Sequence, residues 1–200
     1  MGSAAQPFGI AVCGIEELAG HAGGGASHVI SILDPGHPVP EAFGSFGEHE
    51  KIELRFDDII EEAPGLVAPQ PEDIRRILEL GRSLQAEPPA TRRLLVHCHA
   101  GISRSTAAMS LVLAQALPGQ PAGAILGLVH GLREKAWPNL RMIEMGDAAL
   151  GRGGTLVEAA HALHALQLER RPQLAEFMEA SGRAREVAAA RACAPPAQAT

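Results

Sequence analysis

Tyrosine is absent from this chain of 200 residues, and aromatic residues make up only 3% of it. Binding surfaces that depend on aromatic stacking or on tyrosine-rich contacts are therefore poorly supplied, and the core must be aliphatic. Lysine is also scarce, and the net charge of -6 at pH 7 lacks the basic footprint of a dedicated nucleic-acid binder. We therefore expect no nucleic-acid partner.

The three cysteines, at positions 13, 98 and 193, are too few and too scattered for a disulfide framework or a CxxC metal site. A reduced cytoplasm suits them. No uninterrupted apolar run reaches the roughly 18 residues needed to span a bilayer, and the first residues lack the basic start of a secretory signal. The expectation is a cytoplasmic protein that has no membrane partner.

Length and composition indicate one domain rather than two. An apolar fraction of 46% against 20% charged residues is that of a soluble globular protein. We place an α/β domain in residues 1–170, and we assign residues 171–200 to a C-terminal helix followed by a disordered tail.

Four short segments have the composition of β-strands. Residues 8–13, 28–33 and 93–97 are mainly apolar, whereas residues 51–56 alternate polar and apolar side chains. The alternating pattern is typical of a strand with one buried face. A short helix is expected from Ile15.

Helical patterns separate and follow these strands. A proline and two acids at residues 71–73 predict the first turn of a helix that ends before Pro88, and a second, mostly apolar helix covers residues 104–117. Most of residues 121–190 is helical as well. The alternation of strands and helices predicts an α/β fold with a mainly parallel central sheet flanked by helices and a helical C-terminal part.

The segment VHCHAGISRST, residues 96–106, lies where a predicted strand turns into a predicted helix. Ligands of open α/β sheets bind beyond the carboxyl ends of the strands, and the free amides of a helix N-terminus suit a tetrahedral anion. Gly101 lets the turn close. These amides and a nearby guanidinium favour the thiolate form at Cys98, which makes it a candidate nucleophile. Because the planar fork of Arg104 suits two phosphoryl oxygens, the segment indicates a site for a phosphate monoester.

The pattern is specific only when it is taken as a whole. A cysteine followed six positions later by an arginine is expected about 0.2 times by chance in a chain of this composition. Requiring also His97, Gly101 and a hydroxyl residue after the arginine lowers the expectation to the order of one in ten thousand. The alternative, in which Cys98 is a buried strand-end thiol and Arg104 an ordinary helix residue, is therefore disfavoured.

The sequence HCHAGISRS resembles the HCxxGxxRS signature of cysteine-dependent protein tyrosine phosphatases, in the form typical of the dual-specificity branch and similar to its bacterial members. The resemblance implies a protein tyrosine phosphatase-like fold and a hydrolase that needs no cofactor and no metal. Cys98 would attack phosphorus to give a phosphocysteine intermediate, and water would then release phosphate. The residues that would bind the phosphate oxygens are His99, Ala100, Gly101, Ile102, Ser103 and Arg104.

Two neighbours of this loop match further family positions. Ser105 matches the hydroxyl that stabilises the thiolate as a leaving group, and His97 matches the residue that braces the loop. The alternatives are an ordinary first-turn hydroxyl for Ser105 and a packed strand-end imidazole for His97.

The family also uses a carboxylic acid that protonates the leaving oxygen. Asp57 and Asp58 lie 41 and 40 residues before Cys98, at the end of a predicted strand. Since an aspartate followed by isoleucine resembles the acid position of bacterial members, Asp58 is the first candidate and Asp57 the second. The alternative is a pair of acids that cap a turn.

A proline–asparagine pair follows the cysteine at the spacing found in dual-specificity relatives, with Asn139 lying 41 residues after Cys98. The resemblance implies that the Asn139 side chain supports the surroundings of the site. Taken alone, the pair is only a turn signal.

The resemblance also bears on the substrate, which it implies to be a phosphorylated protein or peptide. Phosphotyrosine is the first candidate, with phosphoserine and phosphothreonine next. A tyrosine wall and a Trp-Pro-Asp loop are missing, which implies a shallow, broad site, and the absence of lysine from the loop disfavours inositol lipids. The alternative function is a catalytically weak phospho-binding or regulatory module that uses the same loop.

Two further hypotheses concern the remaining cysteine and histidine residues. Cys13, on a neighbouring predicted strand, would form a protective disulfide with an oxidised Cys98. His161 and His164 have helical i, i+3 spacing, but no acidic or cysteine partner completes a metal site nearby, so ordinary surface or core roles are expected.

Overall fold

The computed structural model describes residues 7–193, and its centre is one sheet of four parallel strands. The strands are β1 (Gly9–Cys13), β2 (His28–Leu33), β3 (Glu50–Arg55) and β4 (Arg93–His97), and their order in the sheet is β1-β4-β2-β3. Each of the four predicted strands is present within about one residue. The predicted parallel sheet is confirmed.

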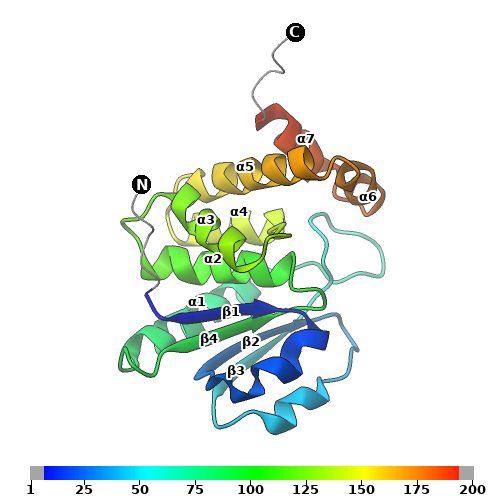
Figure 1. Ribbon diagram of the computed structural model, residues 1–200. Helices are drawn as coiled ribbons and strands as arrows, with labels where there is room; N and C mark the ends of the chain where they lie inside the picture. Colours follow the sequence, from blue (N-terminus) through cyan, green and yellow to red (C-terminus); the bar gives the residue numbers. More distant parts are fainter. Residues whose placement is uncertain (1–6, 194–200) are drawn as a thin grey trace.

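Within residues 7–193, seven α-helices follow or connect the strands, as Figure 1 illustrates. They are α1 (Pro71–Ala86), α2 (Arg104–Ala116), α3 (Ala122–Leu132), α4 (Leu140–Ala149), α5 (Thr155–Arg170), α6 (Leu174–Ala180) and α7 (Ala184–Cys193). The predicted first and second helices correspond to α1 and α2. Among residues 7–193, no helix is both long enough and apolar enough to cross a membrane.

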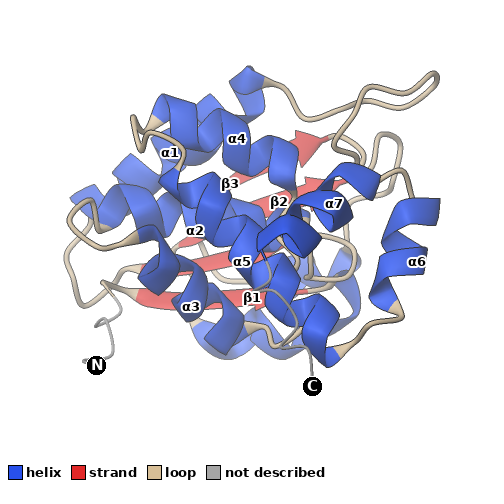
Figure 2. Ribbon diagram, turned by 90° about the horizontal axis from the view of Figure 1, so that it is seen from above, coloured by secondary structure: helices blue, strands red, loops and turns tan. Residues whose placement is uncertain are grey.

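The helices form layers on one face of the sheet. Helices α1 and α2 pack on the strands, α3 and α4 lie over α2, and α5 lies over α3 and α4 (Figures 1 and 2). The other face is covered by two 3-10 segments, η1 (Ile15–Gly24) and η2 (Glu41–Ser45). A helix was expected from Ile15, but the segment forms 3-10 turns, in keeping with its several glycines, which are poor α-helix formers.

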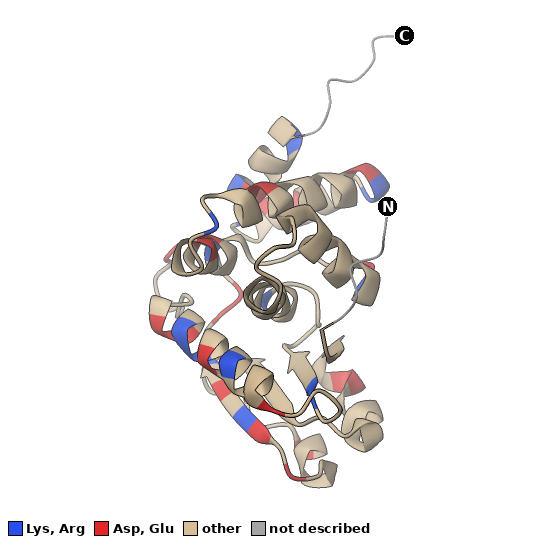
Figure 3. Ribbon diagram, turned by 90° about the vertical axis from the view of Figure 1, so that its left-hand side faces the viewer, with Lys and Arg blue, Asp and Glu red and all other residues tan. Residues whose placement is uncertain are grey.

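Helix α2 lies at the middle of these layers. Every residue from Arg104 to Ala114 is buried, and its two inner hydroxyl residues, Thr106 and Ser110, bond back to carbonyl oxygens of the preceding turn. Arg104, at the first position, is the only charged residue of this helix, which Figure 3 shows end-on beneath the upper helices. An apolar helix surrounded on all sides thus carries one cation at its N-terminus, where the sheet ends.

The C-terminal helices pack back toward that same end of the sheet. Helix α7 lies on α5, and α6 lies beyond the carboxyl ends of the strands (Figure 2). Trp137, Ala175, Met178 and Val187 form a small buried cluster there. The predicted domain boundary at residue 170 stays a prediction, and the tail predicted after the last helix, residues 194–200, lies outside the described residues.

Candidate active site

The segment from Cys98 to Ser103 connects β4 to α2 at the carboxyl edge of the sheet. Cys98 is 2% exposed, and its Sγ lies 3.2 Å from the Oγ of Ser105. The Ser105 hydroxyl can therefore donate a hydrogen bond to a thiolate at this position. His97 is fully buried, with its Nε2 2.7 Å from the Oγ of Ser31 on the neighbouring strand. This bond joins the start of the loop to the middle of the sheet.

Carbonyl oxygens of the loop are held from outside. The backbone N–H of Ile15 donates to His99 O at 2.9 Å, and that of Trp137 donates to Ile102 O at 2.9 Å. Arg133 donates to the two carbonyls between them, those of Ala100 and Gly101, at 3.1 Å each. Within residues 7–193, the backbone N–H groups of residues 99–104 have no protein acceptor. The loop is thus a row of free donors, as an anion site requires.

Gly101 is the point where the loop touches β1. Its φ is +69°, and a Cβ built on it would lie 2.5 Å from the backbone C of Cys13. The left-handed conformation costs any other residue about 1–2 kcal/mol, and the clash adds to this cost. Only glycine fits here.

We expect Gly101→Ala to lower the free energy of unfolding by at least about 2 kcal/mol, because it combines a left-handed alanine with a backbone clash. Urea unfolding measures the change. Gly127→Ala is the matched control, since Gly127 lies within α3 and a Cβ there meets nothing within 4 Å. Gly127→Ala should raise the free energy of unfolding by up to about 1 kcal/mol. Equal effects of the two substitutions would contradict the packing of Gly101 against β1.

Arg104 is buried, 3% exposed, and anchored through one nitrogen. Its Nη1 donates to the Oδ1 of Asp34 at 2.6 Å and to the carbonyl oxygen of Phe56 at 2.6 Å. Its Nε is buried and has no partner among the described residues. One edge of the guanidinium, formed by Nε and Nη2, is therefore left to bind two oxygens of a ligand side by side.

Asp34 was missed in the sequence analysis, although it directly follows β2 at the carboxyl edge of the sheet. Besides Arg104, it contacts His99, whose Nε2 accepts from the Asp34 backbone N–H at 3.2 Å and lies 3.5 Å from its Oδ2. Burial lowers the pKa of His99, and the negative charge of Asp34 acts in the opposite direction without cancelling the shift. An acid at a strand end was the available signal.

The two candidate acids have different surroundings. The Oδ1 of Asp58 accepts a hydrogen bond from Ser103 Oγ at 2.7 Å, so this carboxyl lies against the loop. Asp57 instead accepts from the backbone N–H of Val67 at 2.7 Å through its Oδ2, and its own N–H donates to Val67 O at 2.7 Å. Asp57 closes the base of the segment that carries Asp58, and only Asp58 contacts the loop.

Asn139 is fully buried and joins two parts of the site. Its Nδ2 donates to Asp58 Oδ1 at 2.9 Å and to Ile59 O at 3.2 Å, and its Oδ1 accepts from the Met142 backbone N–H at 3.1 Å as the N-cap of α4. The side chain thus connects the acid segment to a helix end.

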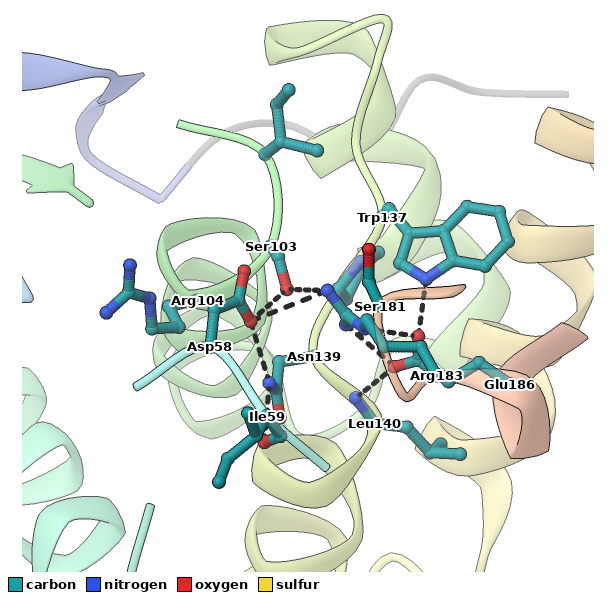
Figure 4. A network of polar contacts seen from close by, with 12 residues as sticks. Asp58, Ile59, Ser103, Arg104, Trp137, Asn139, Leu140, Ser181, Arg183 and Glu186 are labelled. Atoms are coloured by element: carbon teal, nitrogen blue, oxygen red, sulfur yellow. Dashed lines mark hydrogen bonds and ion pairs between the residues drawn. The ribbon is translucent and has the colours of Figure 1, made fainter. Parts of the chain in front are cut away.

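A second buried arginine, Arg183, approaches the site from between α6 and α7 (Figure 4). Its Nη1 donates to Ser103 Oγ at 2.9 Å and lies 3.5 Å from Asp58 Oδ1. Burial disfavours its charge, but Asp58 and Glu186 outweigh burial and raise its pKa. The sequence analysis missed Arg183, because nothing in the sequence near residue 183 indicates that this side chain will reach the site.

One cavity of about 520 Å³ contains Cys98, Arg104 and Asp58. Its apolar walls come from the loop, from Trp137 and from α6, and they are Ile102, Trp137, Leu174, Phe177 and Met178. The sequence predicted a shallow, broad site. In the structure, side chains of α6 line the cavity beside the loop.

Cys13 and His164 have surroundings that favour packing roles. Both are fully buried, and burial raises the pKa of Cys13 to about 12, so that it stays a thiol at neutral pH. His164 stacks on Trp137 with ring centroids 4.2 Å apart. Within residues 7–193, no group of three or more His, Cys, Asp or Glu side chains could hold a metal ion. The disulfide between Cys13 and Cys98 stays a hypothesis.

His97 and His164 are expected to make the fold sensitive to acid. Burial lowers the pKa of His97 to about 4 and that of His164 to about 3, whereas an unfolded histidine titrates near 6.5. Because the unfolded chain takes up these protons first, the free energy of unfolding should fall as the pH drops from about 6.5 to 5. The slope is about 1.4 kcal/mol per pH unit for each histidine.

Urea unfolding in steps between pH 7.5 and 5 measures this slope. His164→Gln should reduce this slope by about 1.4 kcal/mol per pH unit, which is the contribution of one histidine. An unaltered slope in His164→Gln would mean that His164 takes up no proton on unfolding.

Comparisons with known proteins identify the fold. A scan against models of protein families and a search of curated protein sequences each found no match. Solved structures do match: human DUSP28 at a TM-score of 0.52 and 15% identity, covering 72% of this chain and 94% of that one, and Cydia pomonella PTP-2 phosphatase at 0.54 and 16%, covering 70% and 84%. A third is the human tyrosine phosphatase-like serine/threonine/tyrosine-interacting protein, at 0.50 and 18%, covering 70% and 87%.

These likenesses show that the chain has the same fold as these solved structures. The predicted protein tyrosine phosphatase-like fold is therefore confirmed. The identities stay below 20%, so the likeness concerns the fold, and each match leaves more than a quarter of this chain uncovered.

Proposed function

We propose that the protein hydrolyses phosphate monoesters through a phosphocysteine intermediate on Cys98. One observation carries the proposal: a single cavity holds the Cys98 thiol, the free edge of Arg104, and the carboxyl of Asp58 beside a loop of free amides. These are a nucleophile, an anion clamp and a proton donor, which are the parts that phosphoryl transfer to an enzyme group needs.

The first step transfers the phosphoryl group to sulfur. The loop amides and Arg104 bind the non-bridging oxygens, and the thiolate of Cys98 attacks phosphorus. The S–P bond forms while the bond between phosphorus and the ester oxygen breaks. Asp58, protonated at this stage, gives its proton to the leaving oxygen, which departs as an alcohol or phenol.

The second step returns the enzyme to its starting state. Asp58, now a carboxylate, takes a proton from a water molecule, whose oxygen attacks phosphorus while the S–P bond breaks. Inorganic phosphate and the Cys98 thiolate result. The Ser105 hydroxyl, 3.2 Å from Sγ, stabilises that thiolate as it leaves.

For the substrate we propose a phosphorylated protein or peptide, with phosphotyrosine as the preferred residue. The cavity extends beyond the loop between apolar walls that include Trp137 and Phe177. An aromatic ester can pack against these walls while its phosphate reaches the loop, whereas phosphoserine offers little surface to them. Phosphoserine and phosphothreonine are then slower substrates.

The test is hydrolysis of para-nitrophenyl phosphate in the presence of EDTA, followed by a panel of phosphopeptides matched in sequence. We expect that chelation does not reduce phosphate release and that phosphotyrosine is turned over faster than phosphoserine. We also expect acid quenching to trap a phosphoenzyme with the pH-dependent lability of phosphate bonded to sulfur. Binding of phosphopeptides without turnover would instead support the alternative, a phospho-binding module. The fold alone does not distinguish an enzyme from a binding module, because one of the matching structures is named as an interacting protein.

A further inference from the structure

Arg183 is a buried charged side chain. It is 5% exposed, and it lies 125 residues from Asp58 in the sequence, between α6 and α7. Burying a guanidinium costs several kcal/mol unless its donors are matched by acceptors in fixed positions. The arrangement of those acceptors therefore indicates what the side chain does.

Glu186 fixes one side of the guanidinium. Its carboxylate is fully buried and accepts from Arg183 Nη2 at 2.8 Å. The same carboxylate accepts from the Trp137 indole at 2.6 Å and from the Leu140 backbone N–H at 2.9 Å, at the start of α4 (Figure 4). Because Glu186 also accepts from Trp137 and Leu140, in the segment that leads into α4, Arg183 is held rigidly with respect to α4.

The other side of the guanidinium orders the proton positions around the candidate acid. Arginine only donates, so Ser103 Oγ accepts from Arg183 Nη1 at 2.9 Å, and the single Ser103 hydroxyl proton is then directed to Asp58 Oδ1 at 2.7 Å. Asn139 donates to the same Oδ1. Every hydrogen bond of the Asp58 carboxyl thus falls on Oδ1, and Oδ2 has no partner among the described residues.

This arrangement matters because Asp58 lies in a long connection. No helix or strand interrupts the chain between Arg55 at the end of β3 and Pro71 at the start of α1. Such a segment can move the acid by more than the 1 Å that reduces proton transfer strongly. A fixed cation at its side, reached directly at 3.5 Å and through Ser103, restrains it.

We propose that Arg183 is a positioning residue that holds Asp58 over the loop, with Oδ1 engaged and Oδ2 free to carry the transferred proton. The C-terminal helices are then part of the active site rather than an appendage to it. This inference rests on the proposed function, since it assigns Arg183 a role through Asp58.

The experiment measures kcat/KM for phenyl phosphate and para-nitrophenyl phosphate in wild type, Arg183→Met and Arg183→Lys. The leaving group of phenyl phosphate needs a proton, whereas that of para-nitrophenyl phosphate needs little. We expect Arg183→Met to lower kcat/KM about 10- to 100-fold for phenyl phosphate and less than about threefold for para-nitrophenyl phosphate. The lysine variant, which keeps a charge but lacks the fork, should recover part of the loss.

The double variant Asp58→Asn/Arg183→Met separates positioning from a merely structural role. If Arg183 acts through Asp58, adding Arg183→Met to Asp58→Asn lowers phenyl phosphate turnover no further. The inference would be overturned if the losses of the two single variants multiplied in the double variant. Equal losses on both substrates in Arg183→Met would overturn it as well. Arg191→Met is the matched control, because Arg191 lies on α7 and its partner among the described residues is the exposed Glu179.

Failure of the inference and failure of the proposed function have different results. A wild-type protein that does not turn over para-nitrophenyl phosphate contradicts the function itself. A wild type that is active and depends on Asp58, alongside an Arg183→Met variant that equals it on phenyl phosphate, contradicts only the inference. Circular dichroism and thermal unfolding identify a variant that does not fold, in which case Arg183→Lys carries the comparison.

Discussion

Replacement of Cys98 by serine is expected to lower hydrolysis of para-nitrophenyl phosphate by about four orders of magnitude or more. A serine hydroxyl in the same place is a far weaker nucleophile than a thiolate, because it is almost never ionised near neutral pH. Within residues 7–193, the side chain hydrogen-bonded to Cys98 is Ser105, whose hydroxyl is not a base. The measurement is kcat/KM in EDTA with the protein concentration high enough to follow slow turnover.

The Cys98→Ser variant should still bind phosphate. The free amides of the loop and the anchored Arg104 do not depend on the sulfur, so inorganic phosphate should bind with an affinity within about tenfold of wild type by calorimetry. Cys193→Ser, which changes an exposed cysteine, is the control and should leave activity unchanged. Full activity in Cys98→Ser would mean that another residue is the nucleophile.

The parts of the fold that were predictable from the sequence are those whose cause is local. The strands and α2 follow from runs and periods of apolar residues, and the turn from β4 into α2 follows from residues 98–104, which are contiguous. Asn139 was predicted from a short motif at a fixed spacing, and the structure brings it to Asp58.

The parts that were missed depend on contacts between distant segments. Asp34 lies 70 residues from Arg104, and Arg183 lies 125 residues from Asp58, so no window of sequence contains both partners. The cavity walls were missed for the same reason, since α6 reaches the loop only through tertiary packing. The chemistry of a contiguous loop can therefore be predicted from a single sequence, whereas the distant residues that position the loop and line the cavity cannot.

A second large effect is expected from Asp58→Asn. Asparagine has nearly the same shape and can accept from Ser103 through its oxygen, but it carries no transferable proton. We expect kcat/KM to fall about 100- to 1,000-fold for phenyl phosphate and less than about tenfold for para-nitrophenyl phosphate, whose leaving group departs without protonation. The ratio of the two losses is the quantity to measure, because it cancels changes in folding or in phosphate binding.

Asp57→Asn provides the control one residue away. The Asp57 carboxylate accepts from the Val67 backbone, so its loss should loosen the base of the acid segment and lower both rates by a similar, small factor. A leaving-group-dependent loss in Asp57→Asn, with equal losses in Asp58→Asn, would transfer the role of acid to Asp57. The structure argues against that outcome, because Asp58 lines the cavity with Cys98 and contacts the loop, whereas the hydrogen bonds of Asp57 go to Val67.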